Sequence, residues 1–285
     1  MSITLRPAVP DDAKACGTIC YEAFSGVAKV CHFPSEFASA DQAIALITWM
    51  IGHAGFYGVV AERDRRIVGS NFLDLRGDIA GVGPVTVDQS AQNGGIGRRL
   101  MEDVLRRAEQ VQAPSIRLVQ AAAQGRSLAL YTELGFDVRE PLACMNGKPP
   151  KTTVPGHDVR PARPVDLAAC SLLTQKALGH DRKGELRDAI SAGSVRIVER
   201  EGHVTGYSTG INYTGHTVAA SNSDMKALIG AAVEFGRPGF LLPMRNADLF
   251  RWCLEHGLKI SHPLTLMSKG DYADPTGAFL PSIMY

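Results

Sequence analysis

A strand, a glycine-rich loop and a helix follow one another between residues 84 and 111, and no other stretch constrains the fold of this chain as strongly. Val85, Thr86 and Val87 form a β-branched run that is typical of a buried strand. The loop that follows contains Gly94, Gly95 and Gly97. After the loop, apolar residues recur at helical spacing, at Leu100, Met101, Val104, Leu105, Ala108 and Val111.

The loop predicts a site for an anion. No Ser, Thr or Asp stands immediately before the helix, so the free N–H groups of its first turn lack the usual cap. The glycines leave these donors uncovered and let a ligand approach the backbone closely. Arg98 and Arg99 lie at the helix end whose dipole favours anions over cations. A phosphate bound at the loop explains all of these features, whereas a glycine-rich turn with solvated arginines is the simpler alternative.

Composition limits the kinds of partner that we expect. The 285 residues suit two domains, and 45% hydrophobic and 21% charged residues are ordinary for a soluble globular protein. A net charge of +1 provides no basic field for nucleic acid or for an anionic membrane. The N-terminus has no signal-peptide core, and the six cysteines show neither Cys-x-x-Cys nor zinc spacing. We therefore expect a reduced, cytoplasmic protein without a metal site.

Two motifs indicate which anion the loop binds. A Walker loop requires a Lys that is missing here, and a dinucleotide fingerprint would need Gly where Arg99 stands. The run Gln92-Asn-Gly-Gly-Ile-Gly97 instead resembles the Gln-x-x-Gly-x-Gly pyrophosphate loop of the GNAT superfamily, the coenzyme A-dependent N-acetyltransferases. The run Ser127-Leu-Ala-Leu-Tyr-Thr-Glu-Leu-Gly-Phe136 resembles the closing helix of that superfamily, with its Tyr-x-x-x-Gly-Phe pattern.

The resemblance implies the GNAT fold, an α/β (mixed α+β) central sheet flanked by helices. The residues agree with that order of elements. Strands are expected at 3–8, 57–62, 67–75, 82–88, 115–120 and 136–145, and helices at 10–24, 41–53, 98–111 and 126–134. A loop that contains several serines, Gly26 and Pro34 is expected at 25–39.

The second half of the chain repeats the first. Residues 5–16 parallel residues 159–170 at a constant offset of 154, so that Arg160 corresponds to Arg6. We expect two tandem GNAT-like domains, 1–146 and 157–285, joined by a linker at 147–156 that is rich in Gly and Pro. The later copy lacks the Gln-x-x-Gly-x-Gly loop and has Cys253 where the first has Tyr131. The N-terminal domain should therefore hold the cofactor, and the C-terminal one should be structural or wall off the substrate.

The resemblance also implies how acetyl-CoA, the expected acetyl donor, would be bound. Backbone N–H groups of the loop would hold the pyrophosphate, and the preceding strand would bind the pantetheine and supply an N–H to the oxyanion. Gln124 stands near the position where the superfamily usually has Asn. The cofactor-binding residues expected on this basis are Val85, Thr86, Val87, Gln92, Asn93, Gly94, Gly95, Ile96, Gly97, Arg98 and Gln124.

Tyr131 matches the general-acid tyrosine of the superfamily, and packing is the alternative role for it. A phenol of pKa ~10 suits a thiolate leaving group whose thiol has a pKa of ~8.5. No motif marks the general base. Asp74, near the end of a predicted strand, is the first candidate; His32 and His53 follow, and a water chain could replace all three.

The function expected from these residues is an N-acetyltransferase that moves acetyl to a primary amine of a small molecule or peptide by direct attack in a ternary complex. A non-catalytic acetyl-CoA-binding or regulatory module is the alternative. The loop at 27–39 and the tail at 271–285 are candidate walls of an acceptor pocket, although the tail could instead close the sheet of the second domain. Neither a polyamine nor a nucleic acid is favoured, because the chain has no excess of charge.

Overall fold

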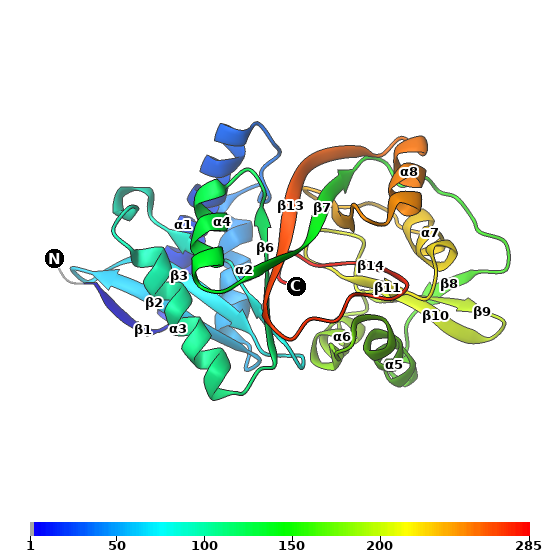
Figure 1. The fold of residues 1–285 in the computed structure, drawn as a ribbon, viewed down its shortest axis with the longest axis horizontal. Helices are drawn as coiled ribbons and strands as arrows, with labels where there is room; N and C mark the ends of the chain where they lie inside the picture. Colours follow the sequence, from blue (N-terminus) through cyan, green and yellow to red (C-terminus); the bar gives the residue numbers. More distant parts are fainter. Residues whose placement is uncertain (1–2) are drawn as a thin grey trace.

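The computed structural model describes residues 3–285, which form two β-sheets covered by helices (Figure 1). The first half contains β1 (Thr4–Pro7), α1 (Ala13–Cys31), α2 (Ala40–Gly52), β2 (Phe56–Arg63), β3 (Arg66–Asp74), β4 (Ala80–Val82), β5 (Thr86–Val87), α3 (Ile96–Gln110), β6 (Ser115–Ala121), α4 (Gly125–Glu133) and β7 (Asp137–Asn146). The second half contains β8 (Asp158–Pro161), α5 (Leu167–Leu178), α6 (Lys183–Ser191), β9 (Arg196–Arg200), β10 (His203–Ser208), β11 (Thr217–Ala219), α7 (Asn222–Gly230), β12 (Phe240–Pro243), α8 (Ala247–Glu255), β13 (Lys259–Gly270) and β14 (Ala278–Leu280). No helix within residues 3–285 is both long and apolar enough to cross a bilayer.

The α/β fold class and the order of elements in the first half are confirmed, with one difference. Helix α1 ends at Cys31 rather than near Phe24, so the expected loop 25–39 shortens to residues 32–39. Gly26 lies inside the helix because one glycine costs only about 1 kcal/mol there relative to alanine. The helix ends where His32 takes a left-handed conformation, with φ at 56°.

The internal repeat is visible as the same ion-pair cluster at the start of each half. Arg6 pairs with Asp12 at 2.7 Å, and Arg160 pairs with Asp166 at 2.9 Å, at the offset of 154 residues found in the sequence. In both copies the aspartate also accepts a hydrogen bond from a backbone N–H three residues earlier, which fixes the short turn before the first helix. The repeated sequence therefore encodes a repeated local structure.

The two halves exchange strands. The larger sheet has the order β1-β2-β3-β4-β6-β13-β7-β12, so β13 of the second half lies between β6 and β7 of the first. Figure 1 shows β13 and β7 side by side at the centre of the molecule. Met267 of β13 is fully buried in the core beneath α3, whereas Met145 of β7 is fully buried in the core formed with α7 and α8. Each half therefore completes the core of the other.

The smaller sheet, in the order β14-β11-β10-β9-β8, shows where the C-terminal tail lies. β14 pairs with β11, through Val218 and Phe279 among other positions, so the tail closes the sheet of the second half, as one of the two expectations for it stated. The tail then continues past β14, and its residues 283 and 284 line the cavity described below. Closure of the sheet is therefore confirmed, and a role of the tail in an acceptor pocket stays a prediction.

Truncating the shared strand's core side chain should destabilise the whole chain. Met267→Ala is expected to lower the free energy of unfolding by about 2–5 kcal/mol, because it leaves a cavity in the first half's core. The strand belongs to both halves, so calorimetry should still show one cooperative transition. Ile260→Ala, on the same strand but 49% exposed, is the control, with a change within about 0.5 kcal/mol. Two separate transitions in the variant would contradict this interlocked arrangement.

Candidate active site

A cavity of about 640 Å³ lies where strands of the first half diverge. β4 pairs with β6 only at Ala80–Ile116 and Gly81–Arg117, and β5 pairs with β3 rather than β6. The edge of β5 that faces away from β3 is therefore free to bond a ligand. The cavity is lined by α1, the loop 32–39, the glycine loop, β6 and α4, and on its far side by residues of the second half.

The glycine loop presents uncapped backbone donors to this cavity. Asn93 and Gly95 take left-handed conformations, with φ at 67° and 73°, and α3 begins with no side chain bonded to its first turn. Within the described chain, the N–H groups of residues 94–98 donate to neither backbone nor side-chain acceptors. A Cβ added at Gly95 would meet nothing within 4 Å. The loop is therefore a concave set of donors suited to a diphosphate.

The structure brings together nearly all of the residues expected to bind the cofactor. Val87 also accepts a hydrogen bond at its carbonyl from the Gln92 side chain at 3.3 Å, which ties the loop to the strand. Of the expected cofactor residues, those that line the cavity are Val85, Thr86, Val87, Gln92, Asn93, Gly95, Ile96, Gly97, Arg98 and Gln124. Gly94 belongs to the same loop but does not itself line the cavity.

Cationic side chains lie around the same end of the cavity. Arg98 lines it and forms an ion pair with Glu133 of α4, which links the start of α3 to that helix. Arg126, in the first turn of α4, is exposed and also lines the cavity. Its charge is available to a ligand phosphate, which sequence analysis did not foresee because no motif places it.

Tyr131 of α4 lines the same cavity as β5. It is 9% exposed, and its ring packs edge-on against Phe136 with the centroids 6.2 Å apart. Burial raises the pKa of its phenol to about 12, although a hydrogen bond with Ser127 acts in the opposite direction. The group therefore stays protonated near neutral pH and can donate a hydrogen bond.

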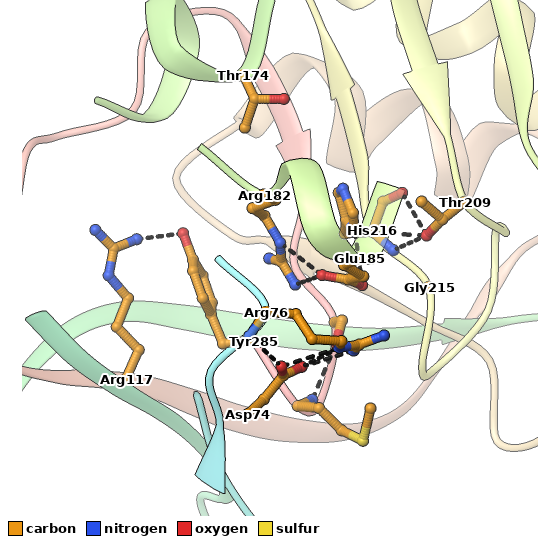
Figure 2. Close-up of polar contacts among 12 residues, drawn as sticks. Asp74, Arg76, Arg117, Thr174, Arg182, Glu185, Thr209, Gly215, His216 and Tyr285 are labelled. Carbon is orange, nitrogen blue, oxygen red and sulfur yellow. Dashed lines mark hydrogen bonds and ion pairs between the residues drawn. The ribbon is translucent and has the colours of Figure 1, made fainter. Parts of the chain in front are cut away.

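Asp74, the first candidate for a base, lies outside the cavity. Its carboxylate is bound by Arg76 (Figure 2). The distance between Oδ2 and Nη2 is 2.6 Å. Arg76 in turn pairs with Asp188 of the second half at 3.0 Å, so this cluster joins the two halves. His53 lies 3.4 Å from the same Asp188, and His32 is exposed; neither lines the cavity. The structure therefore corrects the expectation that Asp74 acts as the base: a cation already binds it, away from the cavity.

Glu36 is the carboxylate that sequence analysis missed. It lies in the loop 32–39 and, among the described residues, is the one acidic residue that lines the cavity. Its Oε1 accepts a hydrogen bond from the hydroxyl of Tyr213, 3.0 Å away in the second half. The available signal was a single acidic residue between Phe33 and Phe37, in a loop already suspected of lining an acceptor pocket.

The second half does not repeat the site. The Ser221 side chain accepts a hydrogen bond from the N–H of Asp224, so α7 has the cap that α3 lacks. Cys253, at the position that corresponds to Tyr131, is fully buried. β14 occupies the edge of β11 beside which a ligand would have to lie. Within residues 3–285, no group of three or more His, Cys, Asp or Glu side chains is arranged to hold a metal ion.

Comparisons with known proteins agree with this geometry. Residues 20–136 match the profile of the acetyltransferase (GNAT) family. The chain is 25% identical to the uncharacterized N-acetyltransferase YitH of Bacillus subtilis (strain 168) over 79% of this chain and 78% of that protein. Its fold is similar to a candidate acetyltransferase of Pyrococcus horikoshii, with a TM-score of 0.75 at 18% identity over 99% and 94% of the two chains. It is also similar to a tandem GNAT protein from the clavulanic acid biosynthesis pathway, with a TM-score of 0.57 at 12% identity over 96% and 100%.

Adding one methyl group to the loop should separate ligand binding from folding. In Gly97→Ala the new Cβ would lie 3.8 Å from Leu130, an ordinary contact, and alanine is favoured in a helix by up to about 1 kcal/mol. The melting temperature should hold or rise. Titration calorimetry should show coenzyme A binding weakened about 10- to 100-fold, the equivalent of one charge-assisted hydrogen bond.

Gly52→Ala is the matched control, since Gly52 ends α2 away from the cavity and has nothing within 4 Å of its added Cβ. It should leave coenzyme A binding unchanged. Equal affinity in Gly97→Ala and the unmodified protein would show that the loop is not where the diphosphate binds.

Proposed function

We propose that this chain, whose residues 20–136 match the acetyltransferase (GNAT) family, transfers an acetyl group from acetyl-CoA to the primary amine of a small molecule or peptide. The observation that carries the proposal is a single cavity that holds uncapped loop amides, a free strand edge, Tyr131 and one carboxylate. The amides suit a diphosphate, and the free strand edge suits the amides of pantetheine. Tyr131 suits a thiolate leaving group, and the carboxylate suits an ammonium.

In this proposal the donor lies between the diverging strands. The N–H groups of residues 94–98 hold the pyrophosphate, and Arg126 adds a charge at the margin. The free edge of β5 bonds the pantetheine, and an N–H of the strand stabilises the oxyanion that forms at the acyl carbon. Gln124, at the N-terminus of α4, lines the same path.

The transfer forms one bond and breaks one. The neutral amine nitrogen forms a bond to the acyl carbon, the C–S bond breaks, and the proton that the nitrogen loses on becoming an amide ends on the departing sulfur, so that coenzyme A leaves as a thiol. Full transfer from a phenol of pKa about 12 to a thiolate is uphill, because the thiol's own pKa is near ~8.5. Tyr131 therefore contributes chiefly through the hydrogen bond that it gives to the departing sulfur in the transition state.

Direct attack in a ternary complex fits the residues better than an acyl-enzyme. Among the described residues that line the cavity there is no cysteine to take up the acyl group. Burial raises the pKa of the Cys16 thiol to about 11 and that of Cys144 to about 12, which leaves them protonated and unreactive. All six cysteines are free, which supports our placing the protein in the reducing cytoplasm.

Removing one hydroxyl tests the role of the acid. Tyr131→Phe keeps the ring contact with Phe136 and loses only the donor, so turnover should fall by roughly 10²-fold or more. The Kd for acetyl-CoA should stay the same. Thiol release, corrected for hydrolysis, and calorimetry measure the two quantities. Unchanged turnover with a series of amines would remove Tyr131 from the mechanism.

A further inference from the structure

The loop 32–39 brings a carboxylate to the cavity and is held there by the second half. Glu36 accepts the hydrogen bond of Tyr213, and Tyr213 is only 4% exposed. Phe33 stacks on His262 of β13, with ring centroids 4.4 Å apart and an interplanar angle of 16°. Within the loop, the hydroxyl of Ser35 donates to the carbonyl of Phe37 at 3.0 Å. The position of Glu36 therefore depends on contacts from both halves.

Among residues 3–285, Glu36 forms no ion pair, and its hydrogen-bond partner is the hydroxyl of Tyr213. Arg98, Arg126 and Arg237 line the same cavity without pairing with it. The ionisable groups that face it are Tyr213 and the thiols of Cys20 and Cys144, and burial raises the pKa of all three. Burial also raises the pKa of Glu36 to about 7, opposed by the hydrogen bond from Tyr213. This carboxylate forms no ion pair within the protein and lies beside a cavity large enough for a ligand. It is therefore suited to bind a cationic group of that ligand.

Apolar side chains line the same cavity as this carboxylate. The rings of Phe24 and Phe37 pack edge to face, with their centroids 6.1 Å apart, and line the cavity together with Phe33. Ile283 and Met284, which follow β14, line it as well. A second ammonium group on the ligand would lose its hydration there without gaining a counter-charge, because the cavity has no other acidic residue among those described.

The tail that supplies these two residues is fixed at several points. The N–H of Ile283 donates to the carbonyl of Tyr213 at 2.9 Å, so the tail is bonded to the residue that holds Glu36. Figure 2 shows the hydroxyl of Tyr285 bonded to Arg117 of β6, and His180 lies 3.2 Å from the same hydroxyl. These contacts keep residues 283 and 284 in place as a wall.

We propose that Glu36, Tyr213 and residues 283–284 form an acceptor subsite for a monoamine with an apolar arm, of the arylalkylamine class, and that Glu36 is its general base. The inference rests on acyl transfer to an amine as proposed above. The ammonium gives one proton to Glu36, the neutral nitrogen forms the bond to the acyl carbon, and the C–S bond breaks. The second proton, which the nitrogen loses on becoming an amide, ends on the departing sulfur beside the hydroxyl of Tyr131, and Glu36 releases its own proton to water.

Glu36→Gln keeps the shape of the side chain and removes its charge. With 2-phenylethylamine as acceptor, kcat/KM should fall by about 10²- to 10⁴-fold, while the Kd for acetyl-CoA stays the same. The unmodified protein should lose activity as the pH falls through about 7, because Glu36 becomes protonated, and this limb should be missing in the variant.

Glu22→Gln, which removes a charge from the exposed face of α1, is the control and should leave kcat/KM and the pH profile unchanged. Retained activity with the same acid limb in Glu36→Gln would overturn the proposal.

Tyr213→Phe tests the positioning role of the second half. Tyr213 stabilises the ionised form of Glu36, so its loss should move the acid limb of the pH profile to higher pH. A purely structural contact would lower activity at every pH without moving the limb. A limb that stays in place would exclude Tyr213 from the subsite.

Acceptor selectivity separates this inference from the proposed function. Acetylation of 2-phenylethylamine should exceed that of 1,4-diaminobutane and of phenylalanine by roughly tenfold or more in kcat/KM, and the reverse preference would overturn the inference.

Calorimetry of 2-phenylethylamine with the coenzyme A-saturated protein gives a second readout. Binding that depends on Glu36 without turnover of any amine would refute the proposed function and support the subsite; turnover that is indifferent to Glu36 would do the opposite.

Discussion

The pairing of β13 with both β6 and β7 is the constraint on which the rest of the molecule depends. Neither neighbour of β13 belongs to its own half, and β7 reaches the second half's core in return. The hydrogen bonds of the central sheet can form only when both halves are folded. Because the same strand carries His262 to the loop 32–39, the exchange also sets one wall of the cavity.

The cavity is lined by groups of opposite electrostatic character. Uncapped amides and the guanidinium groups of Arg98 and Arg126 favour an anion. Glu36, in a loop with Phe33 and Phe37, favours a cation. A doubly negative donor and a positive acceptor would therefore each find one productive orientation, and the reacting atoms would meet between them near Tyr131.

Local patterns were enough to predict the donor side, and non-local contacts decided the rest. The strand, the glycine loop and α3 are marked by residue types at fixed spacing, and the line of cavity residues from Val85 to Arg98 agrees with that reading. Glu36 becomes significant only through Tyr213, which lies 177 residues away, and no periodicity joins the two. The expectation for Asp74 was wrong because of another distant contact. Its partner Arg76 is only two residues away, but Arg76 also pairs with Asp188 of the second half, which helps to orient the pair.

The strand exchange could not be predicted for a similar reason. Alternation of apolar residues shows that a strand is buried but does not say which neighbour it chooses, and β7 and β13 arise from equivalent places in the repeat. The extension of α1 to Cys31 was missed because Gly26 was taken as part of a loop. A single glycine disfavours a helix only weakly, and packing can keep the helix going past it.

The seating of β14 on β11 has a consequence for how the protein moves. In the second half, the edge of β11 is occupied by β14, which belongs to the same chain. Its effective concentration at that edge is therefore higher than that of a free molecule in a cell. In the first half, β5 pairs with β3, and in the proposed mechanism the donor lies along its other edge during each turnover. We therefore expect the second half to open less readily than the first, so that any opening needed by the proposed reaction would occur in the first half.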